Sequence, residues 1–359
     1  MPNRSTGVCR ARVFAAEILR RRFRVGIPLA VARRWIIATT GQTAGAPTGA
    51  ADKRPAPASR AALLRGQWVE VLSAREIGLT LDASGKLEGL PFMPEMTRYC
   101  GRRVRIYRRA EKTCVEGHGL RKLRGTVLLD GLRCDGSSHD GCQRDCLMFW
   151  KEAWLRPVDG PGEPPAADPA GEEALAARLP VKSGERYVCQ STELVGASFD
   201  LRLHDVGQYL REARVGELSP GFFLRIATRV LVNKLRGLLK LPPVGVIRGE
   251  GTAHSKGNLG LRAGDRVEVL SASEIEATVG PKGRNRGLLF EPDMRAYLGG
   301  RYEVSHEISR LISEETGKMV RLTNTVALKG VVCEGLCAKN CPRSNPHFWR
   351  EAWLRRVES

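Results

Sequence analysis

The sequence has no long apolar run, few histidines and no complete catalytic motif. No stretch of its 359 residues reaches the ~20 consecutive apolar residues that a membrane-spanning helix needs, which argues against an integral membrane protein. A Walker A loop, a dinucleotide-binding glycine motif, G-x-S-x-G and H-E-x-x-H are all missing. Only six histidines are present, which limits His-based catalysis. We therefore expect a protein that is not an enzyme.

Acidic residues are scarce near the N-terminus. Residues 1–65 hold twelve arginines and one lysine against Glu17 and Asp52, and so supply more than half of the net charge of +19. We expect a basic, disordered arm and linker over residues 1–60, since such charge blocks are most often solvated. The alternative is an arm that binds nucleic acid or an anionic membrane through residues 1–40. Arg33 and Arg34 directly follow the apolar stretch 25–32, which argues against a cleaved signal peptide.

An internal repeat organises the rest of the chain. Residues 66–77 match residues 264–275 at an offset of 198, and after a one-residue insertion the offset becomes 199. The two copies close with F-W-K-E-A-W-L-R and F-W-R-E-A-W-L-R. A match of this length with one insertion indicates duplication. The predicted parts after the arm are repeat 1 (61–158), a Pro-rich linker (159–180), a helical connector (181–262) and repeat 2 (263–359).

Each repeat has the pattern of a small β-rich domain. Apolar and polar residues alternate near Val69, Val104 and Thr126, which predicts strands with one buried face. Ser73 with Glu76, and the corresponding Ser271 with Glu274, predict helices that start with capping boxes. We therefore expect an α+β fold, mostly β, with two homologous small barrel-like domains of SH3-like type joined by a partly helical connector.

The connector contains an amphipathic helix predicted over residues 222–240. Its apolar stripe includes Ile226, Leu231, Leu235 and Leu238, and its charged residues are all basic. The favoured interpretation is that the stripe packs against one or both repeats. The alternative is a helix that lies on an anionic membrane or contacts nucleic acid.

A cluster of three cysteines and one histidine occurs in each repeat. The predicted metal ligands are Cys134, His139, Cys142 and Cys146 in repeat 1, and Cys333, Cys337, Cys341 and His347 in repeat 2. Three thiolates and one imidazole are a common ligand set of structural zinc. The alternatives are inert buried thiols and an Fe–S or redox centre.

The other cysteines have no counterpart in the repeat. Cys9, Cys100, Cys114 and Cys189 are therefore predicted to be plain core or surface thiols. Nothing indicates export, so disulfides are disfavoured.

Aromatic and charged residues shared by the two copies lie within or just after each cysteine cluster. Trp150 and Trp154 could form a stacking surface for bases or sugars, but the favoured interpretation is a small core beside the cysteine loop. Glu152 and Arg144, which also recur in repeat 2, could pair with each other.

The repeated motifs resemble a bacterial family of hypothetical proteins. The resemblance is carried by G-x-x-V-E-V-L-S-x-x-E-I, F-x-P-x-M-x-x-Y, C-D-G and F-W-[KR]-E-A-W-L, and covers residues 66–158 and 181–357. It implies a cytoplasmic bacterial protein with a duplicated Cys-containing domain and brings no known activity.

The combined expectation is a tandem-domain binding or scaffolding protein with structural zinc in each repeat and a protein partner. The alternatives are a redox enzyme or accessory protein that uses an Fe–S cluster or a catalytic thiolate, and a peripheral membrane protein.

Overall fold

The computed structural model describes residues 62–162, 168–201, 206–250, 257–336 and 339–357. Within the chain, Leu63–Ser359 forms one compact unit. The predicted basic arm and the proposed ligand Cys337 lie outside the described residues.

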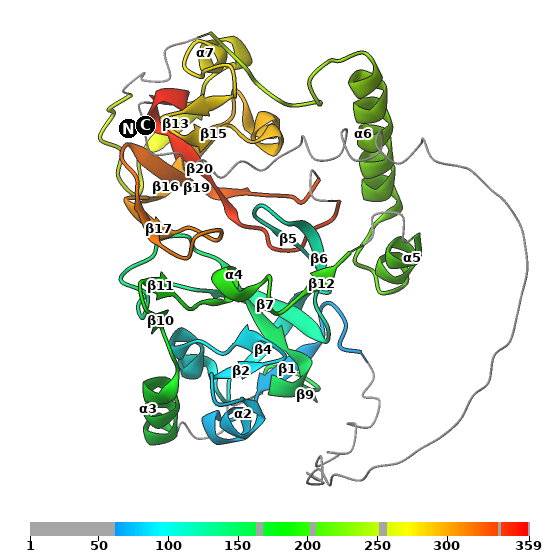
Figure 1. Cartoon of the computed structure of the whole chain (residues 1–359), viewed down its shortest axis with the longest axis vertical. Coiled ribbons are helices and arrows are strands. Elements are labelled where there is room, and N and C mark those ends of the chain that lie inside the picture. The colour runs from blue at the N-terminus through cyan, green and yellow to red at the C-terminus, as the bar shows by residue number, and fades with distance from the viewer. Residues whose placement is uncertain (1–61, 163–167, 202–205, 251–256, 337–338, 358–359) are drawn as a thin grey trace, which may run out of the picture. The chain divides into compact units, whose positions relative to one another are not determined.

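Each repeat folds around a curled, five-stranded antiparallel sheet that forms half a barrel (Figure 1). The strands of repeat 1 are β1 (Trp68–Val71), β4 (Arg103–Arg109), β7 (Thr126–Arg133), β8 (Leu147–Lys151) and β9 (Leu155–Val158). Those of repeat 2 are β13 (Arg266–Val269), β16 (Arg301–Glu307), β19 (Thr325–Val332), β20 (Pro346–Arg350) and β21 (Leu354–Arg356). The orders β8-β7-β4-β1-β9 and β20-β19-β16-β13-β21 are the same order in the two copies. The prediction of a duplicated, mostly β protein is confirmed at this level.

The two sheets also share their irregularities. The β4–β7 pairing shifts between Ile106 and Arg108, and the β16–β19 pairing shifts at the corresponding place, between Val304 and His306. Such bulges bend a strand and increase its twist, which lets a short sheet curl. Sequence and backbone geometry were therefore duplicated together.

Smaller elements cover the open sides of the sheets. In repeat 1 these are α2 (Ala74–Thr80), β2 (Lys86–Leu87), β3 (Leu90–Pro91), η1 (Pro94–Tyr99), β5 (Lys112–Val115), β6 (Gly119–Lys122) and η2 (Glu152–Trp154). In repeat 2 they are α7 (Ala272–Glu276), β14 (Arg284–Asn285), β15 (Leu288–Leu289), η3 (Pro292–Tyr297), β17 (Arg310–Ile312), β18 (Met319–Arg321) and η4 (Glu351–Trp353). Both predicted capping boxes are present, at Ser73 and Ser271.

The conserved tryptophans form the centre of each core, as the favoured interpretation predicted. Trp150 and Trp154 are fully buried and meet Phe92 edge to face at centroid distances of 6.1 and 5.2 Å. Phe290 makes the same contacts in repeat 2. These rings are thus not available as a surface for stacking bases or sugars.

The segment between the repeats contains more secondary structure than the proline content of its linker suggested. Within the predicted linker 159–180, residues 169–178 form α3 (Pro169–Arg178), which begins at the N-cap Asp168 and buries Leu175. Proline is favourable at the first helical position, and A-G-E-E-A-L-A-A-R is rich in good helix formers. The elements that follow are β10 (Lys182–Ser183), β11 (Arg186–Tyr187), α4 (Gln190–Glu193), β12 (Phe199–Asp200), α5 (Val206–Arg214) and α6 (Pro220–Leu238).

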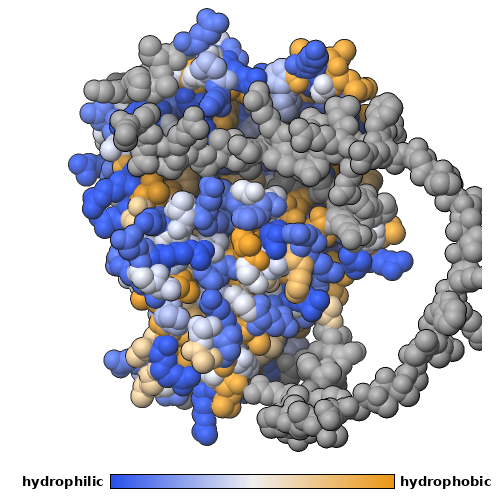
Figure 2. Space-filling model, in the orientation of Figure 1, coloured by the Kyte–Doolittle hydropathy of each residue, from blue (hydrophilic) through white to orange (hydrophobic). Residues whose placement is uncertain are grey.

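Helix α6 leaves most of its apolar stripe uncovered. Ile226 is 3% exposed, whereas Leu231, Leu235 and Leu238 are 58%, 53% and 80% exposed. The expectation that the stripe packs against the repeats is therefore wrong along most of the helix. No helix among the described residues has the length and apolarity to cross a bilayer. In the view of Figure 2, hydrophilic residues dominate and hydrophobic ones form scattered patches.

A buried hydrogen bond that recurs in both cores can be tested by substitution. The indole N–H of Trp154 donates to Thr80 Oγ1 at 3.0 Å, and that of Trp353 donates to Thr278 Oγ1 at 3.1 Å. Thr80→Val keeps the shape but leaves a buried donor unpaired, so we expect a loss of about 1–3 kcal/mol in the free energy of unfolding, measured by denaturant titration. Thr80→Ser retains the hydroxyl and should cost less. Equal losses in both variants would contradict the assignment.

Candidate metal centre

The cysteine loop of each repeat is closed by a glycine that no other residue can replace without movement. Gly136 has φ of +69°, and a Cβ there would lie 2.1 Å from the carbonyl oxygen of Cys142. Gly335 has φ of +74°, and its Cβ would lie 2.4 Å from the carbonyl oxygen of Cys341. The loop thus folds back so that the backbone of Cys142, or of Cys341 in repeat 2, lies directly against the glycine.

In repeat 1 the loop brings Cys134 and His139 to a buried carboxylate from η1. His139 Nδ1 lies 2.5 Å from Glu95 Oε1, and Cys134 Sγ lies 4.0 Å from the same oxygen. Glu95 and His139 are 3% and 1% exposed. Ligand atoms of these three residues lie within 4.8 Å of one another, so they could hold a metal ion. Two of the four ligands predicted for repeat 1 are thus brought together.

Hydrogen bonds orient the imidazole for this role. His139 Nε2 lies 3.0 Å from the carbonyl oxygen of Val188, so Nε2–H is the donor there and Nδ1 faces the carboxylate. A metal-bound histidine commonly donates its other N–H to a backbone carbonyl in the same way. The second oxygen of Glu95, Oε2, is buried and has no hydrogen-bond partner among the described residues.

The electrostatics of this group favour an added positive charge. Burial and the Glu95 carboxylate raise the pKa of the Cys134 thiol. Burial opposes the charged form of His139, but the hydrogen bond and charge of Glu95 outweigh it and raise the pKa of the imidazole. Without a metal, these shifts favour the protonated forms of Cys134 and His139, whose protons a divalent cation would replace.

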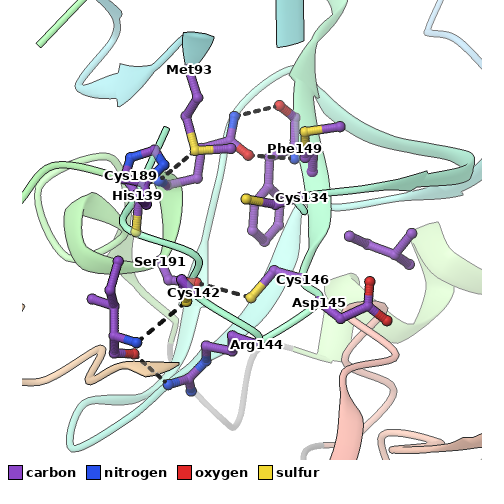
Figure 3. Close-up of a pocket in the computed structure, with 14 residues that line it drawn as sticks. Met93, Cys134, His139, Cys142, Arg144, Asp145, Cys146, Phe149, Cys189 and Ser191 are labelled. Carbon is purple, nitrogen blue, oxygen red and sulfur yellow. Dashed lines mark hydrogen bonds between the residues drawn. The ribbon is translucent and has the colours of Figure 1, made fainter. Parts of the chain in front are cut away.

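Three further thiols line the same small pocket (Figure 3). Cys142 and Cys146 come from the loop, as predicted, while Cys189 comes from the connector just before α4. Burial raises the pKa of Cys189 to about 11. The prediction that Cys189 is a plain thiol missed this placement, because the connector is not duplicated and repeat comparison could not include it.

Repeat 2 places its predicted ligands differently. His347 is buried and its Nδ1 lies 2.9 Å from Glu291 Oε2. Within the part of the chain that the structure describes, its Nε2 has no hydrogen-bond partner. Burial raises the pKa of Cys333 to about 12. No three such residues within the described part of repeat 2 meet as closely as Glu95, Cys134 and His139.

The carboxylate–imidazole pairs of the two repeats occupy different positions. Glu291 and His347 correspond by the repeat offsets to Met93 and Met148. Both members of the pair differ together, from two methionines in repeat 1 to an acid and an imidazole in repeat 2. This exchange accounts for the histidine of the repeat 2 pattern, whereas Cys146 opposite Asn345 and Cys337 opposite Ser138 are separate differences.

One cysteine of each loop, Cys142 in repeat 1 and Cys341 in repeat 2, contacts the other repeat. Cys142 Sγ accepts a hydrogen bond from the backbone N–H of Ile312 at 3.3 Å, and Cys341 Sγ accepts one from that of Cys114 at 3.2 Å. Cys114 and Ile312 occupy corresponding places in β5 and β17. The contact is therefore reciprocal, as in a symmetric dimer.

The conserved arginines reinforce this contact. Arg144 donates to the carbonyl oxygen of Ile312 at 3.0 Å, and Arg343 donates to that of Cys114 at 2.9 Å. Both arginines also reach Glu314, at 3.3 and 2.9 Å. The suggested pairing with the conserved glutamates is wrong.

Those glutamates fasten each repeat to its own N-terminal segment instead. Glu152 accepts a hydrogen bond from the backbone N–H of Leu63 at 3.3 Å, and it also pairs with Arg109 of β4 at 2.7 Å. Glu351 accepts backbone N–H groups from Leu259, Gly260 and Leu261.

Comparison with family models, with curated proteins and with solved structures finds no match. The geometry above therefore carries the functional argument.

The loop-closing glycine provides a matched test of this geometry. Gly131 has nearly the same φ, +69°, but open space where its Cβ would be. Gly131→Ala should cost about 1–2 kcal/mol of folding free energy from left-handed strain alone. Gly136→Ala adds a backbone collision, so we expect an additional loss of about 1–3 kcal/mol in chemical denaturation. Equal losses would show that the loop closes less tightly than described.

Proposed function

We propose that the protein is a non-catalytic tandem-repeat binding or scaffolding protein whose first repeat is stabilised by a structural zinc ion. The observation that carries this proposal is the buried group Glu95, Cys134 and His139, with further thiols lining the same pocket. The SH3-like barrel type and a cytoplasmic location remain part of the proposal.

The residues present fit a zinc ion. His139 Nδ1, Cys134 Sγ and a Glu95 oxygen supply three donors of types that zinc accepts in tetrahedral sites. Cys146 and Cys189 line the pocket beside them and are the candidates for the fourth donor. Bound zinc would supply a cross-link between η1, the cysteine loop and the connector, and would compensate the buried carboxylate.

A mixed ligand set favours zinc over an Fe–S cluster. Fe–S clusters are held mainly by thiolates, whereas the residues already gathered here are one thiol, one imidazole and one carboxylate. The zinc proposal does not extend to the site predicted in repeat 2, because the described residues there bring no three such ligands together and Cys341 Sγ faces Cys114 Sγ at 3.3 Å.

The packing of the repeats changes the expected mode of binding. Independent tandem domains gain avidity from a flexible connection. Here hairpins of each repeat contact the loop of the other through Cys142–Ile312 and Cys341–Cys114. We therefore propose that the two repeats present one fixed surface to a partner.

Metal analysis of the anaerobically purified full chain tests the zinc proposal. We expect about one zinc per chain from this site, lost in Cys134→Ser and bound at least about tenfold more weakly in Glu95→Gln. Cys100→Ser is the matched control, because Cys100 is partly buried but lies outside the pocket. Chelation should lower the unfolding temperature of the wild type and the control, but not that of Cys134→Ser.

A wild-type chain without zinc, or one whose zinc content is unchanged in Cys134→Ser, would contradict this site. Iron with acid-labile sulfide would instead support the redox alternative.

The exposed face of α6 supports a second function, peripheral attachment to an anionic membrane. Leu224, Leu231, Leu235 and Leu238 are all more than half exposed and recur at helical spacing on one face. Residues 220–241 contain no acidic residue, and Lys234 and Lys240 are exposed. Exposed leucines with flanking lysines match the chemistry of an interfacial helix.

Vesicle sedimentation tests this attachment. The full chain should bind phosphatidylserine-containing vesicles, and Leu231→Asp with Leu235→Asp should reduce binding at least about tenfold, because both side chains would enter the acyl region. Leu79→Asp, at a residue 76% exposed in α2, is the matched control and should bind normally. Equal binding of all variants would contradict a role for α6 and leave the basic arm as the source of any affinity.

A further inference from the structure

Cys114 and Cys341 form a second thiol centre that the repeat pattern did not predict. Their sulfur atoms are 3.3 Å apart, although the residues are 227 positions apart in the chain. Cys114 lies in β5 of repeat 1 and is partly exposed, while Cys341 lies in the loop of repeat 2 and is 3% exposed. The prediction that Cys114 is a plain thiol therefore missed its contact.

The surroundings fix the two sulfurs against each other. The backbone N–H of Cys114 donates to Cys341 Sγ at 3.2 Å, and the Arg343 guanidinium donates to the carbonyl oxygen of Cys114 at 2.9 Å. Arg343 is itself held by Glu314, whose side chain is 2% exposed. Closing the 3.3 Å gap to a bond of about 2.05 Å requires the two sulfurs to approach each other by little more than 1 Å.

We infer that Cys114 and Cys341 are a modification site: a dithiol that peroxide converts into a disulfide linking the two repeats. This inference is independent of the zinc site in repeat 1, which uses neither residue.

The chemistry balances with hydrogen peroxide as the oxidant. The Cys341 thiolate, stabilised by its N–H donor, attacks one peroxide oxygen to form a sulfenic acid, and the released hydroxide takes up a proton to become water. Cys114 then loses its proton and attacks the sulfenic sulfur, forming the S–S bond and releasing a second water. The two thiols lose two electrons and two protons, and the peroxide is reduced to water.

The corresponding contact between the repeats, at Cys142 and Ile312, contains only one sulfur. Cys142 receives its N–H from Ile312, at the position that corresponds to Cys114. Only one of the two reciprocal contacts therefore contains two sulfurs. The cross-link would join β5 of repeat 1 to the loop of repeat 2 and leave the opposite contact as it is.

Peroxide treatment of the reduced full chain, followed by alkylation and peptide mapping, tests the inference. We expect the loss of two alkylatable thiols, one cross-linked peptide pair containing Cys114 and Cys341, and its reversal by a dithiol reductant. The oxidised chain should unfold about 5 °C or more above the reduced chain, because the link constrains a very long loop. Cys114→Ser and Cys341→Ser should each abolish the peptide and the shift, while Cys100→Ser should retain both.

Mapping of the wild type keeps the test valid if a variant fails to fold. Peroxide that leaves Cys114 and Cys341 alkylatable, or that links either of them to another cysteine, would overturn the inference. So would protection of Cys341 that disappears only after chelation, since that result would assign the residue to a metal ion instead.

Discussion

Two arginines that share one buried carboxylate hold the repeats together. Arg343 and Glu314 are almost fully buried, and Arg144 reaches the same carboxylate from the other repeat. Buried ion pairs of this kind contribute little net stability against an apolar alternative, but removal of one partner leaves an uncompensated charge. Separation of the repeats would therefore break several charge-assisted hydrogen bonds. This cost favours one fixed arrangement of the two repeats.

The reciprocal contact explains how a duplicated domain became asymmetric. In a symmetric dimer both copies of a residue must satisfy the same surroundings, whereas a fused duplicate is free to differ at each place. Cys114 corresponds to Ile312, Cys146 corresponds to Asn345, and the acid–imidazole pair moves between positions. One contact contains a pair of sulfurs, whereas the other sets Cys142 against the backbone of Ile312, so the two corresponding contacts differ chemically.

The features that could be predicted from the sequence are those whose local residue spacing is the same in both copies. The capping boxes at Ser73 and Ser271, the strands near Val69 and Val104, and the tryptophan cores follow from spacing that both copies preserve. The thiol centres were predicted only in part. Cys134 and His139 do meet, but their carboxylate partner Glu95 lies outside the cysteine loop, and Cys189 and Cys114 join through tertiary contacts that no local pattern encodes.

The exposed apolar stripe of α6 is a second feature that the sequence predicts only in part. Its periodicity predicts a helix, and the helix is there, but periodicity cannot say whether an apolar face meets protein or something else. The buried side of α6 is narrow, since Ile226 is its one fully buried residue among those described. Arg229 reaches Asp293 in repeat 2 at 3.3 Å, so charge contacts rather than leucine packing hold this helix to the body. Because α6 contacts the body through its basic side, its leucines face outward. Burial of these leucines in a lipid surface would remove the free-energy cost of exposing them to water, which the unbound chain retains.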